Sequence, residues 1–309
     1  FSKMLHIMKW ALLILACLIH CAAAGSKILI LGDSMGQFSC GTAIDGSMEM
    51  FGGTNRIQEL CKDSTVINYA VSGSTAWQWR SGGSFSATEA FQGAGSGVTH
   101  VWLSVGGNDW MTPMEDADAP GGSAAACEIT QAQLEQRIQK AVDAVNEAAA
   151  SSGITGLKVL MTGYCVPHKP ECNGKTDGSV LIAALQSVAS NNLNVQFVDI
   201  SEACGGTTST VGDAQYFVAD GLHLNQRGYC AAFSKTGVQQ ALGCSGAADP
   251  ASCTTVPGIG CNAGASSGDG NSNGSAGGGS EPEPSAGTRL STGLVIAVAT
   301  LTAVLPMLH

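Results

Sequence analysis

The sequence predicts an α/β protein in which a parallel five-stranded sheet is covered by helices on both faces. Two observations support this prediction. Short apolar runs of strand length alternate along the chain with amphipathic stretches of helical period, and this alternation is typical of parallel sheets. In addition, polar and glycine-rich motifs follow the first three apolar runs, at the edge where open α/β sheets place their ligands.

Five apolar runs are expected to form the strands. The first run, KILIL, ends at Gly32, and the third, HVWLSV, ends at Gly106. Both have the length and apolar composition of strands that are buried on both faces. The five expected strands are residues 27–31, 66–71, 100–105, 157–164 and 195–200.

The clearest helix is expected at residues 129–151. Four apolar residues of this stretch share one helical face, opposite charged side chains, and they are Leu134, Ile138, Val142 and Val145. Further helices are expected at 55–62, 85–92, 177–191 and 225–242, with Asn225 as the cap of the last one.

Four short motifs contain the residues that could perform chemistry. In chain order they are Gly32-Asp33-Ser34-Met35-Gly36, Ser72-Gly73, Gly106-Gly107-Asn108-Asp109 and Asp220-Gly221-Leu222-His223. Each motif alone is also compatible with an ordinary turn, because Gly, Asp, Asn and Ser all favour turns. Together they supply a nucleophile, oxyanion donors, a base and a carboxylate, which suffice to cut an ester through an acyl-enzyme.

Each candidate residue is assigned its role for a specific chemical reason. Ser34 is the candidate nucleophile, because a tight turn after a strand exposes both its hydroxyl and its own N–H. His223 is the candidate base, and Asp220 is close enough in sequence to hold its ring in one tautomer. Gly73 permits close backbone approach, and Asn108 offers an amide that does not titrate. We therefore expect the Ser34 N–H, the Gly73 N–H and the Asn108 amide to form an oxyanion hole.

Three tryptophans follow the second and third motifs closely, and they are Trp77, Trp79 and Trp110. Tryptophan is highly buried on average, so packing in the core is one interpretation. The other is an aromatic wall at the mouth of the pocket, which would suit sugar rings or acyl chains. All three are kept as candidate substrate contacts.

In order and spacing, the four motifs resemble those of the SGNH/GDSL-type hydrolase superfamily over residues 27–243. This resemblance implies a three-layer α/β/α, flavodoxin-like hydrolase domain that needs no metal or organic cofactor. It also implies Ser34 as nucleophile, His223 as base and Asp220 as its orienting acid. Met35 stands where Leu is common in the family, and this difference conserves size and apolarity.

The N-terminus is predicted to be a secretory signal peptide over residues 1–24. Lys3 and Lys9 precede an apolar run that leads into an A-x-A site, and the run is too short to span a bilayer. The hydrolase domain is then expected at residues 26–245.

The remaining residues predict an attachment to the cell surface. Residues 246–287 contain cysteines and then a Gly/Ser/Pro-rich segment, which is typical of a flexible stalk. Residues 288–309 form an apolar tail that fits either a GPI-anchor signal or a short membrane anchor. We expect a secreted protein that is held at the extracellular face of the cell membrane through its C-terminus.

Cysteine usage agrees with secretion. Of the 12 cysteines, Cys17 and Cys21 lie in the predicted signal peptide, which leaves an even number for disulfides. Cys165 and Cys172 are expected to close a short loop, although sequence alone does not determine the pairing. No C-x-x-C or H-x-x-x-H pair is present, so we expect no zinc site.

Charge and motifs together leave two classes of function. The formal net charge of −10 and the lack of a Lys/Arg run argue against nucleic-acid binding. The first class is a monomeric serine esterase that acts on acetylated glycans or on short-chain or lipid esters. The alternative is a catalytically idle binding or adhesion module. The presence of Ser34, Asp220 and His223 favours the esterase.

Overall fold

The computed structural model describes residues 25–39, 57, 61, 63–111, 119, 128–168, 177–244 and 262–263. The chain divides into two units, Phe1–Ser267 and Gly268–His309, and every described residue belongs to the first. The predicted signal peptide, the C-terminal tail, nearly all of the stalk and most of the helix expected at 55–62 lie outside the described residues. Within the described ranges, no helix is both long enough and apolar enough to cross a membrane.

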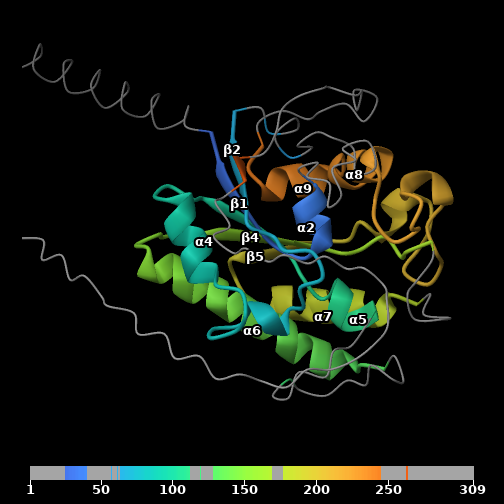
Figure 1. Ribbon diagram of the computed structural model, residues 1–309, viewed down its shortest axis with the longest axis horizontal. Coiled ribbons are helices and arrows are strands. Elements are labelled where there is room, and N and C mark those ends of the chain that lie inside the picture. Colours follow the sequence, from blue (N-terminus) through green and yellow to red (C-terminus); the bar gives the residue numbers. More distant parts are fainter. Residues whose placement is uncertain are drawn as a thin grey trace, which may run out of the picture. The chain divides into compact units, whose positions relative to one another are not determined.

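A parallel sheet forms the centre of the fold, with the strand order β5-β4-β3-β1-β2-β6 (Figure 1). The strands are β1 (Lys27–Gly32), β2 (Thr65–Asn68), β3 (His100–Ser104), β4 (Lys158–Thr162), β5 (Val195–Val198) and β6 (Asn262–Ala263). All five predicted strands are confirmed, and their order is the flavodoxin-like 2-1-3-4-5. The two-residue β6 was not expected; it pairs in parallel with β2 and lies within the range predicted as stalk.

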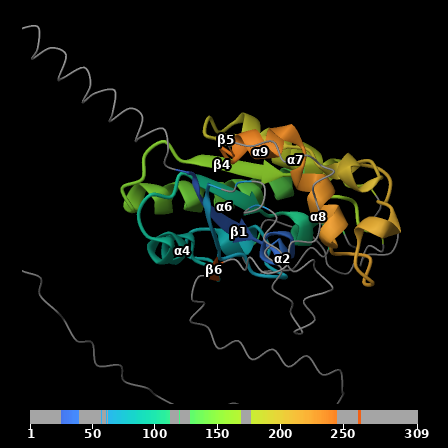
Figure 2. The same ribbon diagram turned by 90° about the horizontal axis from the view of Figure 1, so that it is seen from above.

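Helices cover both faces of this sheet, which confirms the three-layer α/β/α architecture (Figures 1 and 2). One face carries α4 (Ala87–Ala94), α5 (Gly107–Met111), α6 (Gln131–Ser151) and α7 (Ser179–Ser190). The opposite face carries α2 (Ser34–Phe38), α8 (Gln226–Phe233) and α9 (Thr236–Ala241).

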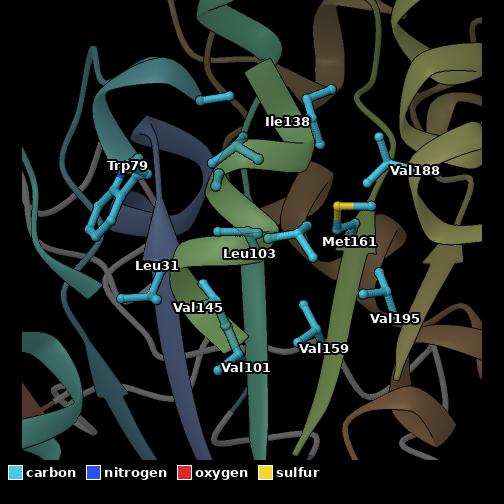
Figure 3. Close-up of a cluster of buried hydrophobic side chains, with 14 of the residues drawn as sticks. Leu31, Trp79, Val101, Leu103, Ile138, Val145, Val159, Met161, Val188 and Val195 are labelled. Carbon is cyan, nitrogen blue, oxygen red and sulfur yellow. The ribbon is translucent and has the colours of Figure 1, made fainter. Parts of the chain in front are cut away.

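Two separate apolar cores result from the alternation of side chains along each strand. In Figure 3, Leu31, Leu103 and Met161 from three adjacent strands pack beneath α6, which contributes Ile138 and Val145. The alternate residues of the same strands face the second core on the opposite side of the sheet. They include Ile28, Ile30, Trp102 and Leu160. Full burial of one such side chain contributes about 1.5–3 kcal/mol, so the strands are stabilised from both sides.

The helix expected at residues 225–242 is interrupted, so this part of the prediction is corrected. Asn225 caps α8 as expected, because its side chain accepts from the Arg227 and Gly228 N–H groups. The chain then leaves the helical conformation at Lys235, whose ammonium donates to the Asp199 carbonyl at 3.1 Å, and α9 begins afterwards. The residues around this break include Ser, Thr and Gly, which have low helix propensity.

The prediction that Cys165 and Cys172 close a short loop is also wrong, because Cys165 forms its disulfide with Cys204. Cys165 follows β4, and Cys204 ends a 3₁₀ turn that follows β5 (Ser201–Cys204). Since β4 and β5 are neighbours and parallel, the residues beyond their carboxyl ends lie together. A second disulfide joins Cys61 to Cys244.

Candidate active site

The first three motifs meet at the carboxyl edge of the sheet, as the sequence predicted. Ser34 begins α2 directly after β1, and Asn108 lies in α5 directly after β3. These two short helices lie on opposite faces of the sheet (Figure 1). Between them is a cavity of about 40 Å³ whose lining includes Ser34, Asn108 and His223.

The turn that carries Ser34 is fixed by Asp33. The Asp33 carboxylate caps α2 by accepting from the Met35 N–H at 3.0 Å. Because the first N–H groups of a helix have no intrahelical acceptor, the Ser34 N–H is available to a ligand. Gly32, the residue before Asp33, has φ +119°, and a Cβ at this position would overlap the Ser104 carbonyl. The chain therefore needs glycine at this point.

Asp33 itself is buried, with 2% of its surface exposed, and it forms three side-chain hydrogen bonds. Besides the Met35 N–H, it accepts from the Ser104 hydroxyl at 2.8 Å and from the Tyr164 hydroxyl at 2.6 Å. Burial raises the pKa of Asp33 to about 6, and the bonds from Tyr164, Ser104 and Met35 offset part of that rise. This carboxyl therefore titrates close to neutral pH although it lies next to the candidate nucleophile.

His223 is held by Asp220 in the manner expected from their spacing. The His223 Nδ1 lies 2.7 Å from Asp220 Oδ2, while Asp220 Oδ1 accepts from the backbone N–H groups of Leu222 and His223 at 2.8 and 3.0 Å. Partial burial alone would raise the pKa of Asp220, but these hydrogen bonds outweigh it and the pKa is lowered. The Asp220 side chain is therefore an ionised partner for the His223 ring.

The His223 ring also packs against α2, the helix that Ser34 begins. Its ring centroid lies 5.0 Å from that of Phe38, with the two planes at 80°. Edge-to-face packing of this kind favours one ring orientation. The base candidate is thus fixed at two points, by the Asp220 carboxylate and by the Phe38 ring.

The loop of the second motif is fastened to α5. The Asn108 amide donates to the Ser74 carbonyl at 2.8 Å, and the Asp109 carboxylate accepts from the Ala76 N–H at 2.7 Å. A side-chain amide has two N–H donors, so the second N–H of Asn108 remains for a ligand. Gly73 has φ +79°, and a Cβ there would meet nothing within 4 Å, so the backbone at this position is open to approach.

The three tryptophans take different positions around this loop. Trp110 lines the cavity, whereas Trp77 and Trp79 are not part of its lining. Trp79 is 2% exposed and donates its indole N–H to the Ser74 hydroxyl at 2.9 Å. Trp77 is 8% exposed and lies under the Arg80 guanidinium, 4.4 Å from the ring centroid. Substrate contact by these rings stays a prediction.

Tyr164 and the buried state of Asp33 were not predicted from the sequence. Tyr164 also lines the cavity, and it lies just beyond β4. That position was the available signal, since residues that follow parallel strands all reach the same edge. Within the described ranges, no group of three or more His, Cys, Asp or Glu side chains gathers as a metal site would require.

The fold and the cavity define an α/β enzyme that brings a serine, a histidine and a carboxylate to one edge of its sheet. The sequence model of the GDSL-like lipase/acylhydrolase family matches residues 30–231. The chain therefore belongs to this family, which confirms the resemblance to SGNH/GDSL hydrolases, and it is a carboxylic ester hydrolase.

Comparisons with individual proteins gave structural similarities only, since no curated protein sequence matched the chain. A carbohydrate acetylesterase family member from Sinorhizobium meliloti is 17% identical, with 71% of this chain and 99% of that chain covered and a TM-score of 0.47. The aryl esterase of M. smegmatis is 17% identical, with 70% and 96% covered and a TM-score of 0.44. A lipase/acylhydrolase from Enterococcus faecalis is 16% identical, with 71% and 96% covered and a TM-score of 0.42.

Proposed function

We propose that the protein hydrolyses carboxylic esters through a Ser34 acyl-enzyme, with His223 as base and Asp220 as its orienting acid. One observation carries this proposal: Ser34 and His223 line the same cavity, and Asp220 lies 2.7 Å from His223 Nδ1. Because Nδ1 is occupied by the carboxylate, the other ring nitrogen, Nε2, is the one left to exchange a proton with a serine hydroxyl.

The proposed reaction has two halves. In the first, His223 Nε2 accepts the Ser34 proton as Oγ attacks the ester carbonyl, and the resulting oxyanion accepts from the Ser34 N–H, the Gly73 N–H and the Asn108 amide. The carbon–oxygen bond to the leaving group then breaks, and His223 donates its proton to the departing alcohol. In the second half, His223 accepts a proton from water as the water oxygen attacks the acyl carbon. The bond between that carbon and Ser34 Oγ then breaks, and His223 returns the proton to Oγ, which releases the acid and free Ser34.

The size of the cavity favours a short acyl group. Its volume is about 40 Å³, and a single water requires roughly 10–15 Å³ measured in this way. An acetyl group therefore suits it better than a long chain. The walls include the apolar side chains of Met35, Met111 and Leu222, which suit an uncharged acyl group. Acetylated glycans and other short-chain esters are the substrates that we infer.

The proposed place of action rests on the sequence of the two ends. The signal-peptide pattern of residues 1–24 and the apolar tail of residues 288–309 support secretion followed by attachment to the extracellular face of the membrane. Release of the protein from intact cells by a phosphatidylinositol-specific phospholipase would support a GPI anchor. Retention after that treatment would favour a membrane-embedded tail.

The alternative, an idle surface module, is separated from the esterase by covalent labelling. A fluorophosphonate probe should label the purified protein, and Ser34→Ala should abolish both labelling and turnover of p-nitrophenyl acetate. Ser151→Ala, at an exposed helix end, is the matched control and should behave as wild type. A folded wild-type protein that takes up no probe would support the idle module instead.

A further inference from the structure

Tyr164 is a cavity side chain to which the proposed reaction gives no role, yet it contacts several parts of the site. Its hydroxyl donates to Asp33 Oδ2 at 2.6 Å and lies 3.3 Å from the Ser104 hydroxyl. Its ring packs on Gly107, where an added Cβ would lie only 2.6 Å from the ring. One side chain thus touches the turn before Ser34, the end of β3 and the first residue of α5.

The position of Tyr164 between the two faces of the sheet is equally specific. Ser34 begins α2 on one face, and Asn108 lies in α5 on the other. Among the described, partly buried apolar side chains, Tyr164 is the one that packs against both cores. It therefore lies where the separation between α2 and α5 is set.

We propose that Tyr164 is a positioning residue that acts through Asp33 to hold the Ser34 turn in register with the Asn108 helix. The inference rests on the proposed function, because it assigns Tyr164 a role relative to Ser34 and Asn108. Tyr164 takes no part in proton transfer to the ester. Its hydroxyl fixes the carboxylate that caps α2, and its ring sets how closely α5 approaches.

The hydrogen bonds around Asp33 show which charge state Tyr164 supports. Tyr164, Ser104 and the Met35 N–H all donate to this carboxylate, and an ionised carboxylate is an acceptor only. A protonated Asp33 accepts fewer hydrogen bonds, because its own O–H must donate and the Tyr164 or Ser104 hydroxyl must then turn to accept it. Loss of the Tyr164 hydroxyl therefore weakens the cap of α2 and favours the protonated form.

The titratable groups that face Asp33 are Tyr164, Tyr229 and His223. The Tyr229 hydroxyl donates to the Met35 carbonyl at 3.0 Å. A positive His223 favours the Asp33 anion, because the two opposite charges attract each other. Tyr164 thus acts on the reaction through a carboxylate that interacts with the catalytic ring.

Tyr164→Phe tests the proposal because it keeps the ring on Gly107 and removes only the hydroxyl. We expect kcat to fall about tenfold, since a hydrogen bond to a charged group is lost, with KM changed by less than about twofold. The acid limb of the kcat/KM profile should move to higher pH. Tyr69→Phe is the matched control, because Tyr69 packs near α4 and does not line the cavity, and it should leave both quantities unchanged.

A double-mutant comparison separates action through Asp33 from direct contact with substrate. Asp33→Asn should lower kcat on its own, and adding Tyr164→Phe to it should change neither kcat nor the acid limb further. Equal losses in the two backgrounds, or an unchanged kcat and pH profile in Tyr164→Phe, would overturn the proposal. Circular dichroism and Tm confirm that each variant is folded.

A final measurement does not depend on Ser34 being the nucleophile. The measurement is Tm as a function of pH in Ser34→Ala protein, where deprotonation of Asp33 should lower Tm as pH rises. When Tyr164→Phe is added, this fall in Tm should extend to higher pH. If Ser34→Ala kept full turnover, the proposed function would fail while this pH shift still tested the contact between Tyr164 and Asp33. No shift in Tm profile would overturn the role given to the hydroxyl.

Discussion

The guanidinium of Arg137 lies 3.2 Å from the carboxylate of Asp109, and neither side chain is exposed to solvent. Burial of an ion pair carries a large desolvation cost, so such a pair is weak evidence for stability alone. Its position suggests a better reason, because Asp109 also accepts from the Ala76 N–H in the loop that contains Gly73. The pair fixes the direction of a carboxylate behind the candidate oxyanion hole.

Arg137→Met should therefore destabilise the protein strongly. Removing one partner leaves the buried Asp109 charge unpaired, and the free energy of unfolding should fall by about 3–5 kcal/mol, measured by urea denaturation. Lys140→Met on the same helix is the control, because its ion pair with Asp143 is exposed and should matter by less than about 1 kcal/mol. Equal midpoints for the two variants would contradict this role of the pair.

Asp220→Asn should lower kcat by about a thousandfold or more while the fold is retained. The amide cannot stabilise a His223 imidazolium and favours the wrong ring tautomer. Steady-state kinetics on p-nitrophenyl acetate measures the effect, with Asp143→Asn on the exposed face of α6 as control. An Asp220→Asn enzyme within tenfold of wild type would show that another group orients the histidine.

Asn108→Ala should lower kcat by about 10²–10³-fold, the usual effect of losing one oxyanion donor. Part of this loss would come from the loop at Gly73, because the Asn108 amide also holds the Ser74 carbonyl. The binding of a stable oxyanion mimic such as a boronic acid should weaken in parallel. If kcat fell and boronate affinity did not, the Asn108 amide would only hold the loop at Ser74 and would not bind the oxyanion.

The contribution of Asp33 to stability and the activity should move in opposite directions between about pH 4 and pH 6. In the overall stability this contribution is offset by His100, because burial lowers the pKa of His100 to about 4 and favours the folded state as pH rises. Burial raises the pKa of Asp33 from 3.8 to about 6, so the folded protein holds this proton more tightly than the unfolded chain. The corresponding stabilisation is complete below pH 4 and is lost as pH rises through 6, a change of roughly 3 kcal/mol. Over the same interval kcat/KM should rise, as the acceptor form of Asp33 is restored. Asp33→Asn should remove this part of the stability slope.

Acyl length should govern turnover. Because the cavity is about 40 Å³, p-nitrophenyl acetate should exceed p-nitrophenyl decanoate in kcat/KM by at least tenfold. Met111→Ala shortens a cavity wall and should narrow that difference, whereas Met161→Ala, in the core beneath α6, should not. A preference for long chains in wild type would overturn the inference of short acyl substrates.

The fold was predictable because its evidence is local. Each strand is a short apolar run, and the alternation of Leu29 and Leu31 with Ile28 and Ile30 between two cores follows from the period of a strand. The motifs at the strand ends were predictable for the same reason. The Asp220–His223 pair needed only a separation of three residues.

The unpredicted features are those that depend on partners distant in the chain. The hydrogen bond between Tyr164 and Asp33 joins residues 131 positions apart. The Cys165–Cys204 disulfide depends on β4 and β5 being neighbours, which the spacing of cysteines does not reveal. The raised pKa of Asp33 arises from burial by several elements at once, and no single segment of sequence carries that information.

The Cys61–Cys244 disulfide joins two residues that are 183 positions apart in the sequence. It thereby closes a covalent ring of chain that contains β3, β4 and β5. A protease that cuts one exposed loop inside this ring leaves two fragments that remain covalently joined. The nicked protein would migrate as one species until it is reduced. Ser34 precedes the ring, whereas Asn108, Asp220 and His223 lie within it. After any single cut inside the ring, the bridge would therefore keep all four residues on one covalently connected molecule.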